Sequence, residues 1–251
     1  MEKQIYKRIF QEKALSLSEA KDFCLWIDIS VANYVKFVLY DPKPLIDDIF
    51  TGDKGVIENK IKNRFKMVFD DCILSTITIS TGKDNPGVKV PNMAYTIQST
   101  AAKPGSGAGV LLYDIVMSWV TNKGKFLTPD RQSISNLAQN VWKYYFTKRK
   151  DVQKVPIDDI HNPVTKNKND DGELYTGDNI PKDSDYKHRN FANMMYQIKK
   201  PLNYISLVKN NKSVLLGLKK KKVNSKFIDY LSKAIWLVSN NFFAKQYQNR
   251  T

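Results

Sequence analysis

The chain has 251 residues and carries 40 Lys or Arg against 25 Asp or Glu, which gives a formal charge of +15 and a pI near 9.6. Its two cysteines and two histidines exclude a disulfide framework and a zinc site of the usual Cys-rich type. No run of about 18 apolar residues predicts a membrane span. The start, MEKQIYKRIF, lacks the apolar core of a signal peptide, so we expect a reducing, intracellular compartment.

The first hundred residues alternate between helical and β-rich patterns. We expect helices over 1–21 and, in two pieces, over 44–65, and strands over 23–29, 35–40, 66–69, 72–80 and 93–100. The last two strands are joined by a turn with Asn85-Pro86-Gly87 at its tip. Cys24 and Cys72 fall within apolar segments, and we interpret both as core thiols.

A glycine-rich segment, Lys103-Pro104-Gly105-Ser106-Gly107-Ala108-Gly109, lies between a strand that ends near Ala101 and an apolar helix over 110–120. Such a turn presents backbone N–H groups at a helix N-terminus, and the missing Cβ atoms let a phosphate approach closely. The segment matches neither the Walker A loop nor the G-x-G-x-x-G fingerprint. A short strand over 125–127 and a strongly periodic helix with Ser133 as its expected N-cap follow.

The segment resembles the cofactor loop of the GNAT acyltransferases, which have a Q/R-x-x-G-x-G/A turn after the fourth strand and then an apolar helix. Aligned on Gly107-Ala108-Gly109, Leu111-Leu112 falls on the family's apolar pair. In the next helix of the family, Asn-x-x-Ala-x-x-x-Tyr, the corresponding residues here are Ser135, Ala138 and Trp142. The chain also resembles GNAT-like proteins of bacteriophages, in which G-x-G-x-x-L-Y-D precedes D-R-x-S-x-S-x-x-A-x-x-x-W; these stretches are 107–114 and 130–142 here.

This resemblance covers residues 22–150 and implies a mixed central sheet flanked by helices, with a strand, helices and three successive strands ahead of the loop. It implies acetyl-CoA or another acyl-CoA as the cofactor and transfer of the acyl group to an amine, without a metal. Backbone N–H groups near Gln98 to Thr100 would polarise the thioester carbonyl. The implied cofactor residues are Lys103, Gly105, Gly107, Ala108, Gly109, Arg131 and Ser135.

The chain departs from the family pattern at the residues that matter most for chemistry. Pro104 occupies the Q/R position, although Lys103 is adjacent. Trp142 replaces the tyrosine that protonates the departing thiolate in many members, and we expect Tyr144 and Tyr145 to point half a turn or more away from it. These two tyrosines and Asp130 are the catalytic candidates. Asp130 has helix capping as its alternative role, and Arg131 has either a phosphate contact or simple solvation.

Positive charge is concentrated at the C-terminal end. Residues 196–251 contain twelve Lys or Arg and one acid, Asp229. The densest run, Lys219, Lys220, Lys221 and Lys222, would attract DNA or RNA. We divide the chain into a GNAT-like domain over 1–157, a polar insertion or linker over 158–187, and a basic α/β extension over 188–251. In this extension we expect strands over 202–208 and 214–218 and an amphipathic helix from Ser225 to about Tyr247.

The polar insertion carries a second set of candidate residues. His161 and His188 flank it, but their spacing matches no metal-ligand motif. We interpret the pairs Asp158-Asp159 and Asp170-Asp171 as solvated acids rather than as a two-metal centre.

Two hypotheses about function follow. The first is a phage-type acyltransferase in the host cytoplasm, with an acceptor that is a protein, a nucleobase or a small molecule. The second is a non-catalytic nucleic-acid-binding or virion-associated protein on a GNAT-derived fold. Neither hypothesis involves a membrane.

Overall fold

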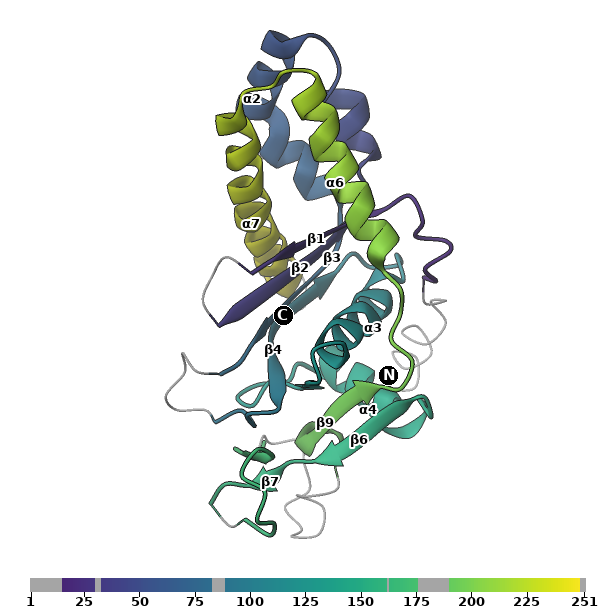
Figure 1. The fold of residues 1–251 in the computed structure, drawn as a ribbon, viewed down its shortest axis with the longest axis vertical. Helices are drawn as coiled ribbons and strands as arrows, with labels where there is room; N and C mark the ends of the chain where they lie inside the picture. Colours follow the sequence, from purple (N-terminus) through teal and green to yellow (C-terminus); the bar gives the residue numbers. More distant parts are fainter. Residues whose placement is uncertain (1–14, 30–32, 83–88, 162, 176–189, 249–251) are drawn as a thin grey trace.

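A seven-stranded sheet with helices on both faces forms the centre of the molecule (Figure 1). The computed structural model describes residues 15–29, 33–82, 89–161, 163–175 and 190–248. Neighbouring strands are antiparallel except β4 and β5, which are parallel, so the predicted α/β fold with a mixed sheet is confirmed. In spatial order the strands are β1 (Cys24–Asp28), β2 (Tyr34–Tyr40), β3 (Ile73–Ser80), β4 (Ala94–Ala102), β5 (Phe126–Thr128), β9 (Met194–Ile198) and β6 (Val152–Pro156).

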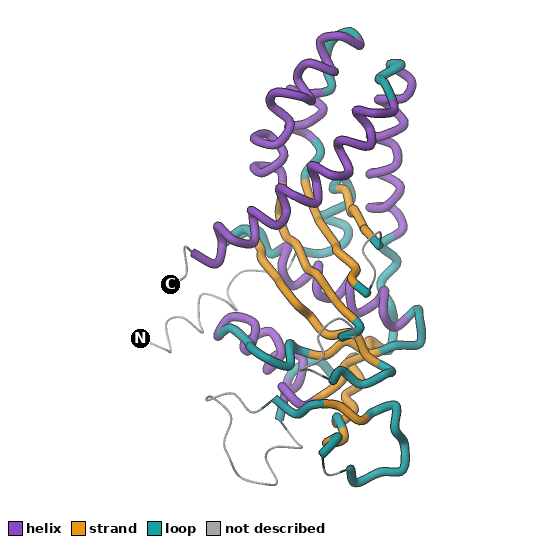
Figure 2. The backbone as a smooth tube through the Cα atoms, turned by 90° about the vertical axis from the view of Figure 1, so that its left-hand side faces the viewer, coloured by secondary structure: helices purple, strands orange, loops and turns teal. Residues whose placement is uncertain are grey.

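The helices divide between the two faces and one edge of this sheet. On one face, α3 (Ala108–Thr121) and α4 (Asn136–Thr147) share a core with β9 and the inner strands. On the other face, the short turn η1 (Leu45–Ile49), α2 (Lys54–Cys72) and α7 (Ser225–Gln248) form a second core. The remaining long helix, α6 (Ile205–Lys220), packs along the edge strand β1. Figure 2 shows the long helices gathered at one end of the molecule, with the strands running from there toward the loops at the other end.

The helix α2 is longer than the sequence predicts. Asp53 caps it by accepting a hydrogen bond from the N–H of Val56, and its buried side chains recur at Ile57, Ile61, Phe65 and Phe69. The expected strand over 66–69 is therefore wrong, because Phe69 continues the four-residue spacing and stacks on Phe65 with ring centroids 5.3 Å apart.

The strands expected over 202–208 and 214–218 are also wrong, since both ranges lie mostly within α6. Leu207, Asn211 and Leu218 are the buried residues of this helix, and their spacing of four and seven residues is helical. Local runs of aliphatic residues suggested strands, but the helical spacing of the buried residues over the whole segment shows that it is a helix. The helix expected from Ser225 onward is confirmed as α7.

The C-terminal part of the chain is built into the sheet rather than appended to it. The strand β9, which the sequence analysis did not predict, lies between β5 and β6. Ahead of the glycine loop the order is two strands, helices and two strands, so the expected order of one strand, helices and three strands is wrong. The polar insertion contributes the two-residue strands β7 (Asp158–Asp159) and β8 (Asp171–Gly172), and the short helical turn η2 (Phe191–Asn193) precedes β9.

Several expectations can be compared directly with the described residues. Cys24 and Cys72 are free and buried, as predicted. None of the described helices is long and apolar enough to cross a membrane. Most of the expected N-terminal helix, the turn tip Asn85-Pro86-Gly87, and His188 lie outside the described residues.

Candidate functional site

An opening in the strand pairing lies at the centre of the sheet. The parallel strands β4 and β5 pair only from Ala94–Phe126 to Thr96–Thr128, after which β5 ends. The hydroxyl of Thr96 still donates to the Pro129 carbonyl at 2.9 Å, but β4 continues for six more residues beyond Thr96, and no described strand pairs with them on the β5 side. The carboxyl ends of adjoining parallel strands are where α/β sheets place their ligands.

A β-bulge bends β4 at the start of this unpaired stretch. Ile97 pairs with Ile79 and Ser99 with Thr78, so Gln98 is the extra residue on β4. A bulge of this kind strengthens the local twist and interrupts the ladder. Gln98 is exposed, and Ser99 and Thr100 are half-buried.

The glycine loop directly follows β4 at this opening. Gly105 and Gly107 have φ values of +76° and +63°, a region that favours glycine. Gly107 is the N-cap of α3, and the Ser106 hydroxyl accepts from the Ala108 N–H while donating to the Lys103 carbonyl at 2.7 Å. The positive end of the α3 dipole and the first-turn N–H groups therefore lie at the end of β4.

Other loop residues have packing roles as well. A Cβ on Gly109 would lie 3.0 Å from the Ala102 Cβ, so the glycine also lets α3 approach β4 closely. The Gly107 carbonyl accepts a hydrogen bond from the Leu15 N–H at 3.3 Å, which ties the segment before β1 to the loop. Lys103 is exposed at the start of the loop.

Asp130 lies just beyond β5, on the other side of the opening. Its Oδ1 accepts from the N–H groups of Gln132 at 2.8 Å and Ser133 at 3.4 Å, so it stabilises a turn. Burial raises the pKa of Asp130 despite these bonds. The N-cap of α4 is Ser135, whose Oγ accepts from the Ala138 N–H at 3.3 Å, and the expectation that Ser133 is the N-cap is wrong.

Arg131 was expected either to contact a phosphate or to be solvated, and both expectations are wrong. Its guanidinium is buried and donates to the carbonyls of Pro129 and Ala192 and to the Asn193 side chain. Burial lowers its pKa to about 10. Arg131 fastens the end of β5 to η2, so the guanidinium is neither solvated nor free to bind a phosphate.

An aromatic cluster lies between α3, α4 and β9. Trp142 is fully buried, with its ring 4.8 Å from that of Tyr196 and 5.7 Å from that of Tyr113. Tyr145 was expected to point away from Trp142, but their ring centroids are 6.1 Å apart because residues three apart share a helix face. Tyr144 stacks edge-on against Tyr145 at 6.0 Å and is half-buried.

The Tyr145 hydroxyl is already engaged in a polar network. It donates to Asp114 Oδ1 at 2.6 Å, and Arg149 donates to both oxygens of the same carboxylate at 3.0 Å. Burial raises the pKa of Asp114, and burial together with this carboxylate raises that of Tyr145. A buried hydroxyl held by a carboxylate is poorly placed to serve a ligand in the opening.

Tyr113 is the residue that sequence reasoning missed. Its hydroxyl is buried beside Thr100, on the unpaired stretch of β4, and burial raises its pKa. Tyr196 donates its hydroxyl to the Phe191 carbonyl at 2.7 Å, whereas that of Tyr113 faces the Thr100 side chain without a well-formed hydrogen bond in the described chain. The L-Y-D stretch carries this tyrosine, but only the fold turns it toward β4.

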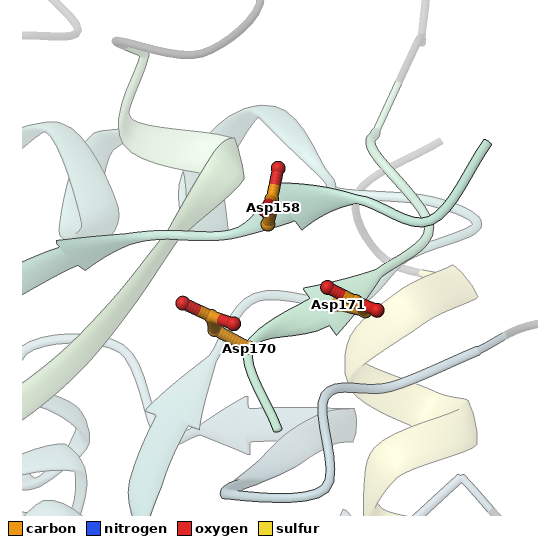
Figure 3. A group of neighbouring side chains, drawn as sticks. All are labelled: Asp158, Asp170 and Asp171. Atoms are coloured by element: carbon orange, nitrogen blue, oxygen red, sulfur yellow. The ribbon is translucent and has the colours of Figure 1, made fainter. Parts of the chain in front are cut away.

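A group of carboxylates lies apart from the opening, at β7 and β8. Figure 3 shows Asp158 on β7 with Asp170 and Asp171 on the neighbouring segment. One carboxylate oxygen from each lies within 4.8 Å of the others, and such hard ligands could hold Mg²⁺ or Ca²⁺. The expectation of solvated acids is wrong for Asp158, which is buried.

Backbone N–H groups from Val164 and Thr165 already stabilise the Asp158 carboxylate. Burial raises the pKa of Asp158, but these bonds outweigh it and leave the pKa lowered. Nearby, His161 pairs with Glu173 at 3.0 Å.

The four-lysine run is divided by the end of α6. Lys219 and Lys220 form its exposed last turn, Lys221 donates from Nζ to the Phe50 carbonyl at 2.8 Å, and Lys222 has a φ of +58° in the turn that follows. The four lysines therefore do not share one face of α6.

Comparison of the chain with protein-family models, with curated proteins and with solved structures gives no match.

Proposed function

We propose that the protein is a GNAT-like acyltransferase that binds an acyl-CoA at the opening between β4 and β5. The observation that carries this proposal is the order of elements at the opening. A glycine turn follows the fourth strand, an apolar helix begins there, and a short fifth strand and a second helix come next. The same order in the GNAT acyltransferases was the basis of the sequence resemblance, and the pairing of β4 with β5 ends at Thr96–Thr128 beside it.

The backbone would provide most of the binding. The N–H groups at the start of α3, together with Lys103, would hold the cofactor phosphates. The unpaired edge of β4 from Gln98 to Thr100 would hold the pantetheine through main-chain hydrogen bonds. Arg131, buried at η2, is left out of this site.

The chemical step is attack of the acceptor amine on the thioester carbonyl. A C–N bond forms, the C–S bond breaks, the amine loses one proton, and the departing thiolate takes one up. Asp130, whose raised pKa favours proton uptake, is the candidate base at the rim of the opening. We assign thiolate protonation to Tyr113 rather than Tyr144 or Tyr145, since the Tyr113 hydroxyl lies beside Thr100 of β4 and, unlike that of Tyr145, is not held by a carboxylate.

The proposal is tested by calorimetric titration of the folded protein with acetyl-CoA. Wild type should bind in the micromolar range, and Gly107→Glu should abolish binding because a carboxylate would occupy the phosphate position. The matched control is Gly124→Glu, which has nearly the same positive φ of +66° but open space around it at the far end of α3. Loss of binding in both variants, or no binding by folded wild type, would contradict the proposal.

Tyr113→Phe tests the chemistry separately from binding. Removing a proton donor lowers turnover by about 10²–10⁴-fold. We expect kcat with an accepted amine to fall while the affinity for acetyl-CoA stays unchanged. An unchanged kcat would remove Tyr113 from the mechanism without affecting the cofactor site.

A further inference from the structure

The outer face of α6 is strongly and evenly basic. Three hydrogen bonds fix the rotation of this helix on the sheet edge. The Tyr40 hydroxyl donates to Asn211 Oδ1 at 2.6 Å, and the Asn210 side chain donates to the carbonyls of Lys21 and Phe23. With Leu207 and Leu218 also buried, the opposite side of the helix faces solvent.

Four exposed lysines lie on that outer side. With 3.6 residues per turn, they and two exposed aliphatic residues fall within an arc of about 100°. This set, the basic face, consists of Ile205, Lys209, Lys212, Leu216, Lys219 and Lys220. From Lys209 to Lys220 it extends for about 16 Å along the helix.

The charges of the basic face are not compensated within the described chain. No salt bridge joins any of the four lysines to a described carboxylate. The helix itself contains no Asp or Glu, and Lys199 and Lys200 precede it. Lys209 and Lys212 are three residues apart, a spacing at which like charges repel one another on a helix. A polyanion along this face would remove that repulsion.

We propose that the basic face binds the phosphate backbone of a nucleic-acid duplex, which goes beyond acyl transfer and does not depend on it. A duplex presents one negative charge per about 1.7 Å of its axis, so the row of lysines can meet several phosphates at once. Single strands are bound through stacking on aromatic side chains, and the basic face has none. A membrane surface calls for a continuous apolar stripe, whereas Ile205 and Leu216 are separated by lysines.

The binding is electrostatic and independent of base sequence. Neutralising four phosphates gives a slope of about −3.6 in log K against log salt concentration. Affinity for a duplex should therefore fall about 100-fold between 50 and 200 mM salt.

The experiment is fluorescence anisotropy of a labelled 20-base-pair duplex titrated with the full chain at several salt concentrations. The test variant replaces Lys209, Lys212, Lys219 and Lys220 with Gln. The control variant removes the same charge from exposed positions on α2 and beyond α4, at Lys62, Lys66, Lys148 and Lys150. We expect the test variant to lose most of the affinity for the duplex and most of the salt dependence. The control variant should keep most of the affinity and most of the salt dependence.

Equal losses in the two variants would overturn the proposal, because net charge rather than the basic face would then explain the binding. It would also be overturned if folded wild type bound only anionic phosphatidylserine vesicles or only single-stranded DNA. If the fourfold variant fails to fold, Lys209→Gln with Lys212→Gln should lower the slope by about 1.8. Acetyl-CoA titration of the same variants separates this result from the acyltransferase proposal, since the basic face lies outside the cofactor site.

Discussion

The two halves of the sheet are held together in different ways. The strands β1 to β4 pair along their lengths in an antiparallel ladder, whereas β5 joins β4 over only three residue pairs and β9 at Leu127–Tyr196. Side chains provide much of the attachment in the second half: Thr128 donates to the Met194 carbonyl, Arg131 reaches Ala192, and Trp142 packs on Tyr196. The difference shows how a continuous sheet can open at its centre without separating, because packing substitutes for the missing ladder.

The largest expected effect tests whether side-chain packing holds the second half of the sheet in place of the missing ladder. Trp142→Ala should destabilise the protein by about 3–5 kcal/mol, since it leaves a cavity in the aromatic cluster. Trp119→Ala is the matched control: Trp119 is half-buried over the paired half, against Phe37 and Tyr95. We expect the control to cost roughly half as much, measured by urea unfolding. Equal costs would mean that the second half does not depend on its side chains more than the first.

The next effect distinguishes two tyrosines within the cluster. Tyr145→Phe should cost about 1.5–3 kcal/mol, because it removes a hydrogen bond to the charged Asp114. Tyr113→Phe should leave the free energy of unfolding unchanged or raise it slightly, since its buried hydroxyl, beside Thr100, makes no well-formed hydrogen bond in the described chain. Thermal unfolding of both variants would measure the difference. A large loss in Tyr113→Phe would show that this hydroxyl is part of the structure rather than held ready for chemistry.

The smallest effect concerns a charge buried in the paired half. Lys36 on β2 is buried, lies 4.6 Å from the Trp236 ring centroid and donates to Asn240 on α7. Burial lowers its pKa to about 8, although the neighbouring Asp28 acts in the opposite direction. Between pH 8 and 10.5 the unfolded chain holds this proton more tightly than the folded protein, so stability should rise with pH in that range.

Lys36→Met should remove the rise and stabilise the protein by about 1 kcal/mol at pH 7. The matched control is Lys123→Met, because Lys123 lies 4.5 Å from the Trp119 ring but is exposed. Urea unfolding at several pH values checks both variants. If stability still rises with pH in Lys36→Met, the rise comes from another titratable group.

Local patterns in the sequence were sufficient for the strands on either side of the glycine loop and for the helices α3, α4 and α7. Each is specified by side chains within one or two turns, or by alternation along a single strand. The glycine loop was also predictable from the sequence, because Gly105 and Gly107 have the positive φ that other residues adopt only at a cost in free energy. The strands expected over 66–69, 202–208 and 214–218 were wrong. Short apolar runs favour strands, and only the spacing of apolar residues across the whole segment shows that each belongs to a helix.

By itself, the sequence determined the composition of the basic C-terminal region, the loop, the strand directly before the loop, and the helix, strand and helix that follow it. Only the tertiary structure decided that β9 inserts between β5 and β6, that Arg131 is buried, and that Asp114 holds the Tyr145 hydroxyl while that of Tyr113 lies beside Thr100. It also decided which lysines share a face of α6. These features depend on pairing and burial between residues far apart in the chain, whose free energy comes from excluding water over surfaces that no local pattern specifies.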